Sequence, residues 1–217
     1  MEEKQIAFPC EARYYTVGKL NADTRQIWVV LHGYGQLAQF FIKKFQSLSD
    51  QNIFVIAPEG LSRFYLSDLT EQGRKDNKVG ATWMTRENRE MDIRNYITYL
   101  DSIFQKESGA FPDLPVTILG FSQGSATATR WAIQGKIKFE KLILWAGLFP
   151  PDMDFTAGHK ILQSKKTILV VGNKDPYLNA ERMKEFDQLA GQLGIVPEKI
   201  LFEGKHEIDE NIVVKLI

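Results

Sequence analysis

The chain contains short, continuous apolar runs of strand length, and each of them ends at a turn signal. They cover residues 27–31, 53–57, 116–119, 142–146, 167–171 and 199–202. A strand that is buried on both faces gives such a run, whereas a half-exposed strand alternates apolar and polar residues. The runs therefore predict a mostly parallel sheet that is covered on both faces. Residues 10–20 and 24–31 are expected to form an antiparallel pair at the start of the sheet.

Amphipathic patterns lie between these runs. Apolar residues recur at three- and four-residue spacing over 93–104, 183–193 and 208–216, which is typical of helices with one buried face. Asn179 stands where it would cap the second of these helices, and Gly194 where it would end it. Alternating strands and helices predict an α/β fold, in which ligand sites form at the carboxyl ends of the strands.

The size and charge of the chain argue against several classes of protein. Its 217 residues suffice for one well-filled core, so we expect a single domain over 1–217. The 27 basic and 27 acidic residues leave no net charge, which argues against a nucleic-acid partner or an anionic membrane surface. No apolar run approaches the roughly 18–20 residues of a membrane helix, so stable membrane insertion is not expected. The oligomeric state is left open, with a homodimer among the allowed states.

The cysteine count and the N-terminal sequence bear on the compartment. Cys10 is the only cysteine, which excludes an internal disulfide framework and fits a reducing environment. The start of the chain, MEEKQIAFPC, lacks the basic and apolar regions of a signal peptide. We therefore expect a cytoplasmic protein. Cys10 stands outside any motif and is expected to be inert.

The strongest local signal is the sequence Gly120-Phe121-Ser122-Gln123-Gly124, which has the form G-x-S-x-G. It follows a predicted strand directly and precedes a helical segment. On such a sharp turn a serine adopts a strained backbone that exposes its Oγ, and the two flanking glycines avoid clashes that a Cβ would cause. The pattern predicts that Ser122 is a nucleophile. An ordinary glycine-rich turn with a capping serine is the alternative.

A serine nucleophile needs a general base. The chain has three histidines, of which only His206 follows the last predicted strand, where the base lies when it comes after the serine in the chain. His32 precedes the serine and is expected to orient its own loop. His159 lies in a stretch of proline, aspartate and glycine with no strand leading into it, and we expect no catalytic role for it. His206 is therefore the predicted base.

The acid that orients the base should lie between the serine and the base, at the carboxyl end of a strand. Asp175 comes just past the run 167–171, and Pro176 stiffens the turn that follows. Asp187 lies on a helical pattern, while Asp152 and Asp154 stand near prolines in a predicted surface loop. Asp175 is the predicted acid, and a plain turn residue is its alternative.

Backbone amides must stabilise the negative oxygen of the intermediate. We expect one from Gln123, the residue after the nucleophile, and the other from the loop LHGYGQ, at Tyr34. Gly33 and Gly35 allow this loop to turn and to approach a ligand. With these groups, the serine would attack a carbonyl carbon and form an acyl-enzyme that water resolves.

Taken together, these segments resemble the α/β-hydrolase superfamily, specifically its phospholipase/carboxylesterase family, which includes bacterial carboxylesterases and acyl-protein thioesterases. The resemblance implies an α/β-hydrolase fold without an inserted cap domain, and a serine hydrolase of carboxylic esters or thioesters that needs no metal or other cofactor. It also implies a Ser122–Asp175–His206 triad with Tyr34 and Gln123 as oxyanion donors. The matching segments are LHGYG, VIAPEG, LGFSQG, VVGNKDP and FEGKHEI.

The sequence departs from that family around the substrate site. Tyr34 stands where the family often has leucine, Gln36 stands where it often has an acidic residue, and Ser125 stands where it commonly has glycine. The segment 82–86 takes the place of the Trp-Phe-Asp type segment of the family. The expected substrate is an acyl ester, either a small molecule or a lipid, and three functions remain open. The first is a carboxylesterase, the second a lysophospholipase or acyl-protein thioesterase with a longer groove, and the third a non-catalytic binding protein. An open apolar channel beside Ser122 favours the longer acyl chain.

The stretch 59–85 is long, polar and glycine-containing, and it predicts one extended loop. Its aromatic residues Phe64, Tyr65 and Trp83 are candidates for the walls of the substrate site, and local packing is an equally weighted alternative. Three phenylalanines after the HGYG sequence are expected in a helix core rather than in a pocket: Phe40, Phe41 and Phe45.

Overall fold

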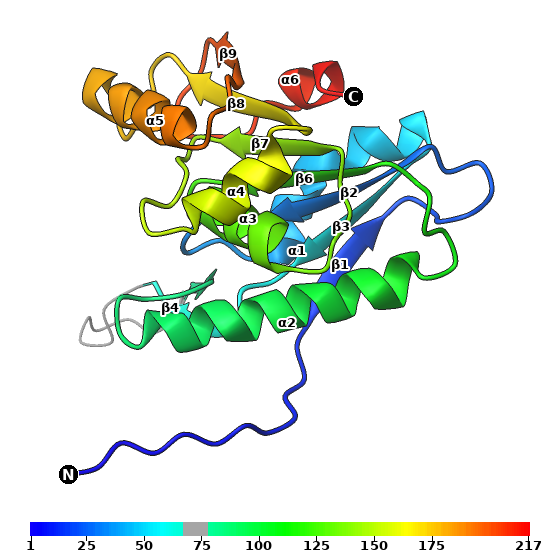
Figure 1. The fold of residues 1–217 in the computed structure, drawn as a ribbon. Helices are drawn as coiled ribbons and strands as arrows, with labels where there is room; N and C mark the ends of the chain where they lie inside the picture. The colour runs from blue at the N-terminus through cyan, green and yellow to red at the C-terminus, as the bar shows by residue number, and fades with distance from the viewer. Residues whose placement is uncertain (67–77) are drawn as a thin grey trace.

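The computed structural model describes residues 1–66 and 78–217. Within this part of the chain, seven strands form one sheet in the order β1-β3-β2-β6-β7-β8-β9 (Figure 1). All neighbouring strands run parallel except β1, which is antiparallel to β3. The strands are β1 (Tyr14–Val17), β2 (Gln26–Leu31), β3 (Ile53–Pro58), β6 (Val116–Phe121), β7 (Lys141–Trp145), β8 (Lys166–Gly172) and β9 (Glu198–Phe202). The predicted α/β fold with a mostly parallel sheet is confirmed.

Each predicted apolar run coincides with a strand, but the predicted pairing of the first two strands is wrong. β1 pairs with β3, with Tyr14 opposite Pro58, and not with β2. β2 instead lies between β3 and β6, with Ile27 opposite both Phe54 and Val116. An almost fully buried strand belongs inside a parallel sheet, whereas the part-exposed sequence YYTV tolerates the edge.

Helices cover both faces of the sheet (Figure 1). One face packs against α2 (Arg89–Ser108), α3 (Gln123–Gln134), α4 (Phe155–Leu162) and α5 (Ala180–Gln192). The other packs against α1 (Ala38–Phe41), the 3₁₀ helix η1 (Ile42–Gln51) and α6 (Glu210–Lys215). Side chains of β2 alternate between the two cores: Ile27, Val29 and Leu31 enter the first, Trp28 and Val30 the second.

Two further segments differ from the sequence prediction. The stretch 59–85 is not one extended loop, because its ends form the antiparallel strands β4 (Ser62–Tyr65) and β5 (Val79–Thr82). Its middle, residues 67–77, lies outside the described residues. The stretch around His159 forms α4, which begins after Asp154, whose side chain accepts a hydrogen bond from the amide of Ala157. Among the helices that the structure describes, none has the length and apolar character needed to cross a bilayer.

The predicted ends of α5 are confirmed. The Asn179 side chain accepts a hydrogen bond from the amide of Arg182 at 3.0 Å, and Gly194 follows the helix with a φ of +64°. The Asn179 side chain satisfies an amide that the helix itself leaves without an acceptor. Gly194 is a residue in the left-handed conformation, which commonly ends a helix.

We expect Asn179→Ala to lower the free energy of unfolding by about 1 kcal/mol, because the cap of α5 is lost. Urea unfolding followed by circular dichroism measures this change. Asn179→Ser keeps a capping oxygen and serves as the control, with most of the stability retained. Equal losses in both variants would contradict a capping role.

Candidate active site

Ser122 sits on a strained turn between β6 and α3. Its φ of 54° and ψ of −117° lie in a region that L-residues rarely adopt. The flanking glycines make this turn sterically feasible. A Cβ on Gly120 would lie 2.1 Å from the carbonyl oxygen of Gly124, and one on Gly124 would lie 2.2 Å from that of Leu31. The helix therefore crosses the strands in direct backbone contact, and the serine is placed at the carboxyl end of β6.

The structure brings Ser122, His206 and Asp175 together from three different loops. His206 Nε2 lies 3.0 Å from Ser122 Oγ, and His206 Nδ1 lies 2.7 Å from Asp175 Oδ2. The Asp175 side chain is fully buried, and its other oxygen accepts a hydrogen bond from the amide of Tyr177 at 2.9 Å. With a proton on Nδ1 held by the carboxylate, Nε2 is free to accept the serine proton. The arrangement can therefore activate a hydroxyl for attack.

The imidazole of His206 packs against two aromatic rings. The centroid of the Phe121 ring lies 4.9 Å from the centroid of the imidazole, and that of the Tyr177 ring lies 4.7 Å from it. Both rings are close in sequence to residues of the relay: Phe121 directly precedes Ser122, and Tyr177 comes two residues after Asp175. The ring orientation is thus fixed by packing as well as by hydrogen bonds.

His32 is the first residue of the loop after β2 and is fully buried. Its Nδ1 donates to the carbonyl oxygen of Gly33 at 2.7 Å, and its Nε2 accepts from the amide of Gly60 at 2.9 Å. Burial lowers the pKa of His32, so the neutral ring with this one tautomer is the form that fits. Both nitrogens are used within the fold, which agrees with the expectation that His32 orients its loop.

The amides of the HGYGQ loop differ in their partners. The amide of Gly33 donates to Gln36 Oε1 at 2.8 Å, and the amide of Gly35 donates to the carbonyl oxygen of Ala81 at 2.9 Å. No acceptor for the amide of Tyr34 is found among the described residues. The amide of Gln123 is the first in α3, where a helix offers no acceptor of its own. These are the two amides predicted for an oxyanion, and that role stays a prediction.

Comparison with known proteins identifies the family. The sequence matches the family model described as serine hydrolase (FSH1) over residues 24–210. The chain belongs to this family. A search of curated protein sequences finds no significant match.

Several solved structures share the fold of this FSH1 family member at low sequence identity. Acyl-protein thioesterase 2 of Zea mays is 15% identical with a TM-score of 0.70, covering 95% of this chain and 96% of the other. Esterase PE8 is 16% identical with a TM-score of 0.65, covering 96% and 100%. SOBER1 of Arabidopsis thaliana is 16% identical with a TM-score of 0.65, covering 89% and 96%. At these identities the likeness shows the fold, and the predicted α/β-hydrolase resemblance and serine hydrolase class are confirmed.

The aromatic residues predicted as walls of the substrate site lie in different environments. Trp83 is 2% exposed, and its indole Nε1 donates to the carbonyl oxygen of His32 at 2.8 Å, so this prediction is corrected: Trp83 is a core residue under the loop. Phe64 packs on the ring of Tyr34 at 5.1 Å beside that loop. Tyr65 is exposed. Sequence patterns do not separate these cases, because all three residues share one polar stretch.

An open cavity of about 660 Å³ lies beside His206. Its size is typical of small-molecule sites. Phe40 and Leu66 line it and are 61% and 49% exposed, so the cavity opens to solvent. The expected core position of Phe41 and Phe45 is confirmed, but Phe40 faces the cavity instead. The other lining residues are Gly35, Gln36, Leu37, Phe41, Lys44, Lys78, Val79, His206, Glu207 and Ile208.

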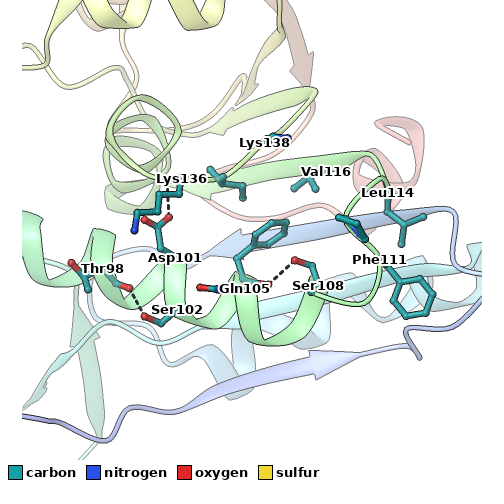
Figure 2. A pocket seen from close by; sticks show the side chains of 14 residues that line it. Thr98, Asp101, Ser102, Gln105, Ser108, Phe111, Leu114, Val116, Lys136 and Lys138 are labelled. Carbon is teal, nitrogen blue, oxygen red and sulfur yellow. Dashed lines mark hydrogen bonds between the residues drawn. The ribbon is translucent and has the colours of Figure 1, made fainter.

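A second cavity of about 560 Å³ lies at the opposite end of the sheet, between α2 and the residues that lead into β6 and β7 (Figure 2). Figure 2 shows Asp101 beside Lys136 at this cavity, and the Asp101 carboxylate accepts a hydrogen bond from the Lys136 amide at 2.9 Å. The same oxygen accepts from Trp131 Nε1 at 2.8 Å. None of the described residues around this cavity is a histidine, so it offers no general base of that kind. Over residues 1–66 and 78–217, no group of three or more potential ligand side chains is arranged to hold a metal ion.

The buried His32 gives the stability of this hydrolase a pH dependence. Because burial lowers its pKa in the folded state, the unfolded chain binds the proton more readily. We therefore expect the free energy of unfolding to fall as the pH drops below about 6.5, the ordinary value for histidine. Urea unfolding at a series of pH values measures the slope.

The variant His32→Gln lacks the titrating ring and is expected to flatten this slope between roughly pH 7.5 and 5.5, whatever its overall stability. His159→Gln is the matched control, since His159 is exposed on α4, and it should leave the slope in place. A slope that survives in His32→Gln would show that another group carries the pH dependence.

Proposed function

We propose that this serine hydrolase cleaves carboxylic esters or thioesters through an acyl-enzyme on Ser122. The observation that carries the proposal is the continuous relay from Ser122 Oγ to His206 and on to Asp175, at 3.0 and 2.7 Å. It is supported by the strained backbone of Ser122, which costs stability and is typical of functional sites. A non-catalytic binding protein, the rival function, has no need of either feature.

Each residue of the site has a role in the proposed reaction. Ser122 Oγ attacks the carbonyl carbon while His206 Nε2 takes its proton, and Asp175 remains ionised and stabilises the imidazolium. The negative oxygen of the tetrahedral intermediate is held by the amides of Tyr34 and Gln123, each worth roughly 3 kcal/mol in comparable sites. His206 then returns the proton to the leaving group. A water molecule then attacks the carbonyl carbon of the acyl-enzyme while His206 takes its proton. His206 returns this proton to Ser122 Oγ, and the carboxylic acid is released.

The open cavity beside His206 favours an acyl ester with a substantial apolar chain. Its walls are mostly apolar, and about 660 Å³ exceeds what an acetyl group needs. A lysophospholipase or acyl-protein thioesterase activity is therefore the second candidate, and the fold likeness to a maize acyl-protein thioesterase and to an esterase supports the same class. No cofactor is part of the proposed reaction. The cytoplasm is the proposed location, supported by the single cysteine.

We expect Ser122→Ala to lower kcat for p-nitrophenyl esters by about 10⁴-fold or more and to abolish labelling by a fluorophosphonate. His206→Ala should lower kcat by a comparable factor, since the serine then lacks its base. Active-site labelling followed by mass spectrometry locates the modified residue.

His159→Ala is the control for His206→Ala, because the Nδ1 of His159 lies 2.8 Å from the carbonyl oxygen of Leu193 and is not part of the Ser122–His206–Asp175 relay. Its activity should match that of the unaltered protein. Hydrolysis that persists in Ser122→Ala, or a label on another residue of the folded protein, would contradict the mechanism.

The cavity predicts a dependence on acyl chain length. We expect kcat/KM to be higher for p-nitrophenyl octanoate than for the acetate. Phe40→Ala should lower the octanoate value by about tenfold, because apolar contact with the chain is lost, and should change the acetate value little. Phe8→Ala removes another exposed phenylalanine and serves as the control. A preference for acetate that Phe40→Ala leaves unchanged would exclude the cavity as the acyl site.

A further inference from the structure

The last residues of β5 lie between the two loops that carry the proposed oxyanion amides. On one side, β5 forms a short antiparallel bridge with the HGYGQ loop. The amide of Gly35 donates to the carbonyl oxygen of Ala81 at 2.9 Å, and the amide of Ala81 donates to that of Gln36 at 3.1 Å. The loop that holds Tyr34 is thus paired with this strand through its backbone.

On the other side, the segment after β5 binds the side chain of Gln123. Gln123 Oε1 accepts from the amide of Trp83 at 3.2 Å, and Gln123 Nε2 donates to the carbonyl oxygen of Met84 at 3.0 Å. Gln123 Nε2 also lies 2.9 Å from the Oγ1 of Thr82, which is itself buried. The carboxamide therefore pairs with the backbone as a neighbouring strand would, and it ties down the first residue of α3.

Trp83 contacts both of these parts of the site. Its backbone amide contacts Gln123, while its indole Nε1 donates to the carbonyl oxygen of His32 at 2.8 Å. The indole also packs on the His32 ring, with the centroids 4.9 Å apart. The indole hydrogen bond is shielded from solvent, since Trp83 is 2% exposed, and a buried polar group that loses its partner is costly. The connection is therefore stiff.

We propose that Trp83 is a positioning residue that sets the separation between the amides of Tyr34 and Gln123. The inference rests on the proposed function, because it assigns these amides to the oxyanion. Donors must lie about 2.7–3.1 Å from the position that the oxyanion occupies, so a small change in their separation affects the transition state more than substrate binding. The side chain of Gln123 is the second part of this brace. Trp83 thereby influences the reaction without touching the substrate.

The test removes the two parts of the brace separately. Trp83→Phe keeps an aromatic ring and loses the indole N–H, whereas Gln123→Met keeps the backbone amide and loses the carboxamide. Each variant is expected to lower kcat by about 10- to 100-fold with KM changed less than about threefold. The inhibition constant of a trifluoromethyl ketone, whose hemiketal places a negative oxygen in the same position, should rise by a similar factor. Rates are normalised to the active sites counted by fluorophosphonate labelling.

Trp131→Phe is the matched control. Trp131 is fully buried, and its indole Nε1 donates at 2.8 Å to Asp101, which lines the second cavity at the opposite end of the sheet from Ser122. This variant should lose stability while kcat per active site and the inhibition constant stay within about twofold of the unaltered protein.

Two results would overturn the inference. One is unchanged kcat and inhibition constant in Trp83→Phe or, if that variant does not fold, in Gln123→Met. The other is a loss of kcat with no change in the inhibition constant, which is the outcome of a purely structural role. Failure of the proposed function is distinguishable from both, because the unaltered protein would then show no Ser122-dependent hydrolysis or labelling.

Discussion

The close crossing of β6 and α3 at Ser122 is the constraint on which the site depends. Backbone atoms meet there without room for a Cβ on Gly120 or Gly124, and the serine between them is forced to a φ of 54°. Such a conformation costs of order 1–3 kcal/mol and persists only where the surroundings over-determine it. Here the amide of Ser122 donates to the carbonyl oxygen of Trp145, and the hydroxyl of Ser125 donates to that of Gly120. The sheet and the helix together thus hold the hydroxyl in one position.

Indole N–H groups anchor the other loops of the site. Trp83 donates to the carbonyl oxygen of His32, and Trp145 donates to that of Glu207 at 2.8 Å, next to His206. Loop carbonyls at the end of a sheet lack strand partners, so a buried donor from the core is an efficient way to satisfy them. The hydrophobic core and the geometry of the site are thus parts of one packing arrangement.

The sequence predicts structure well where a local residue pattern is required by the burial or the backbone conformation of the same segment. Apolar runs predicted every strand of the main sheet that is buried on both faces, and G-x-S-x-G predicted the strained turn that the structure contains. The partner of β1 was mispredicted because an edge strand carries no signal for which edge it joins. The roles of Trp83 and Phe40 were also missed. The sequence does not distinguish the buried indole of Trp83 from the exposed ring of Phe40. Their exposure depends on where the HGYGQ loop lies in the folded protein.

The span of the relay along the chain has a consequence for when chemistry can begin. His206 and Ser122 are 84 residues apart, and His206 follows β9 at the outer edge of the sheet. A contact between residues so far apart in the chain requires both segments to be present and the intervening chain to be closed into a loop. A chain emerging during synthesis therefore holds its serine long before it holds the base. In the proposed mechanism, a chain in which β9 has not yet joined the sheet has its nucleophile but lacks the base that activates it.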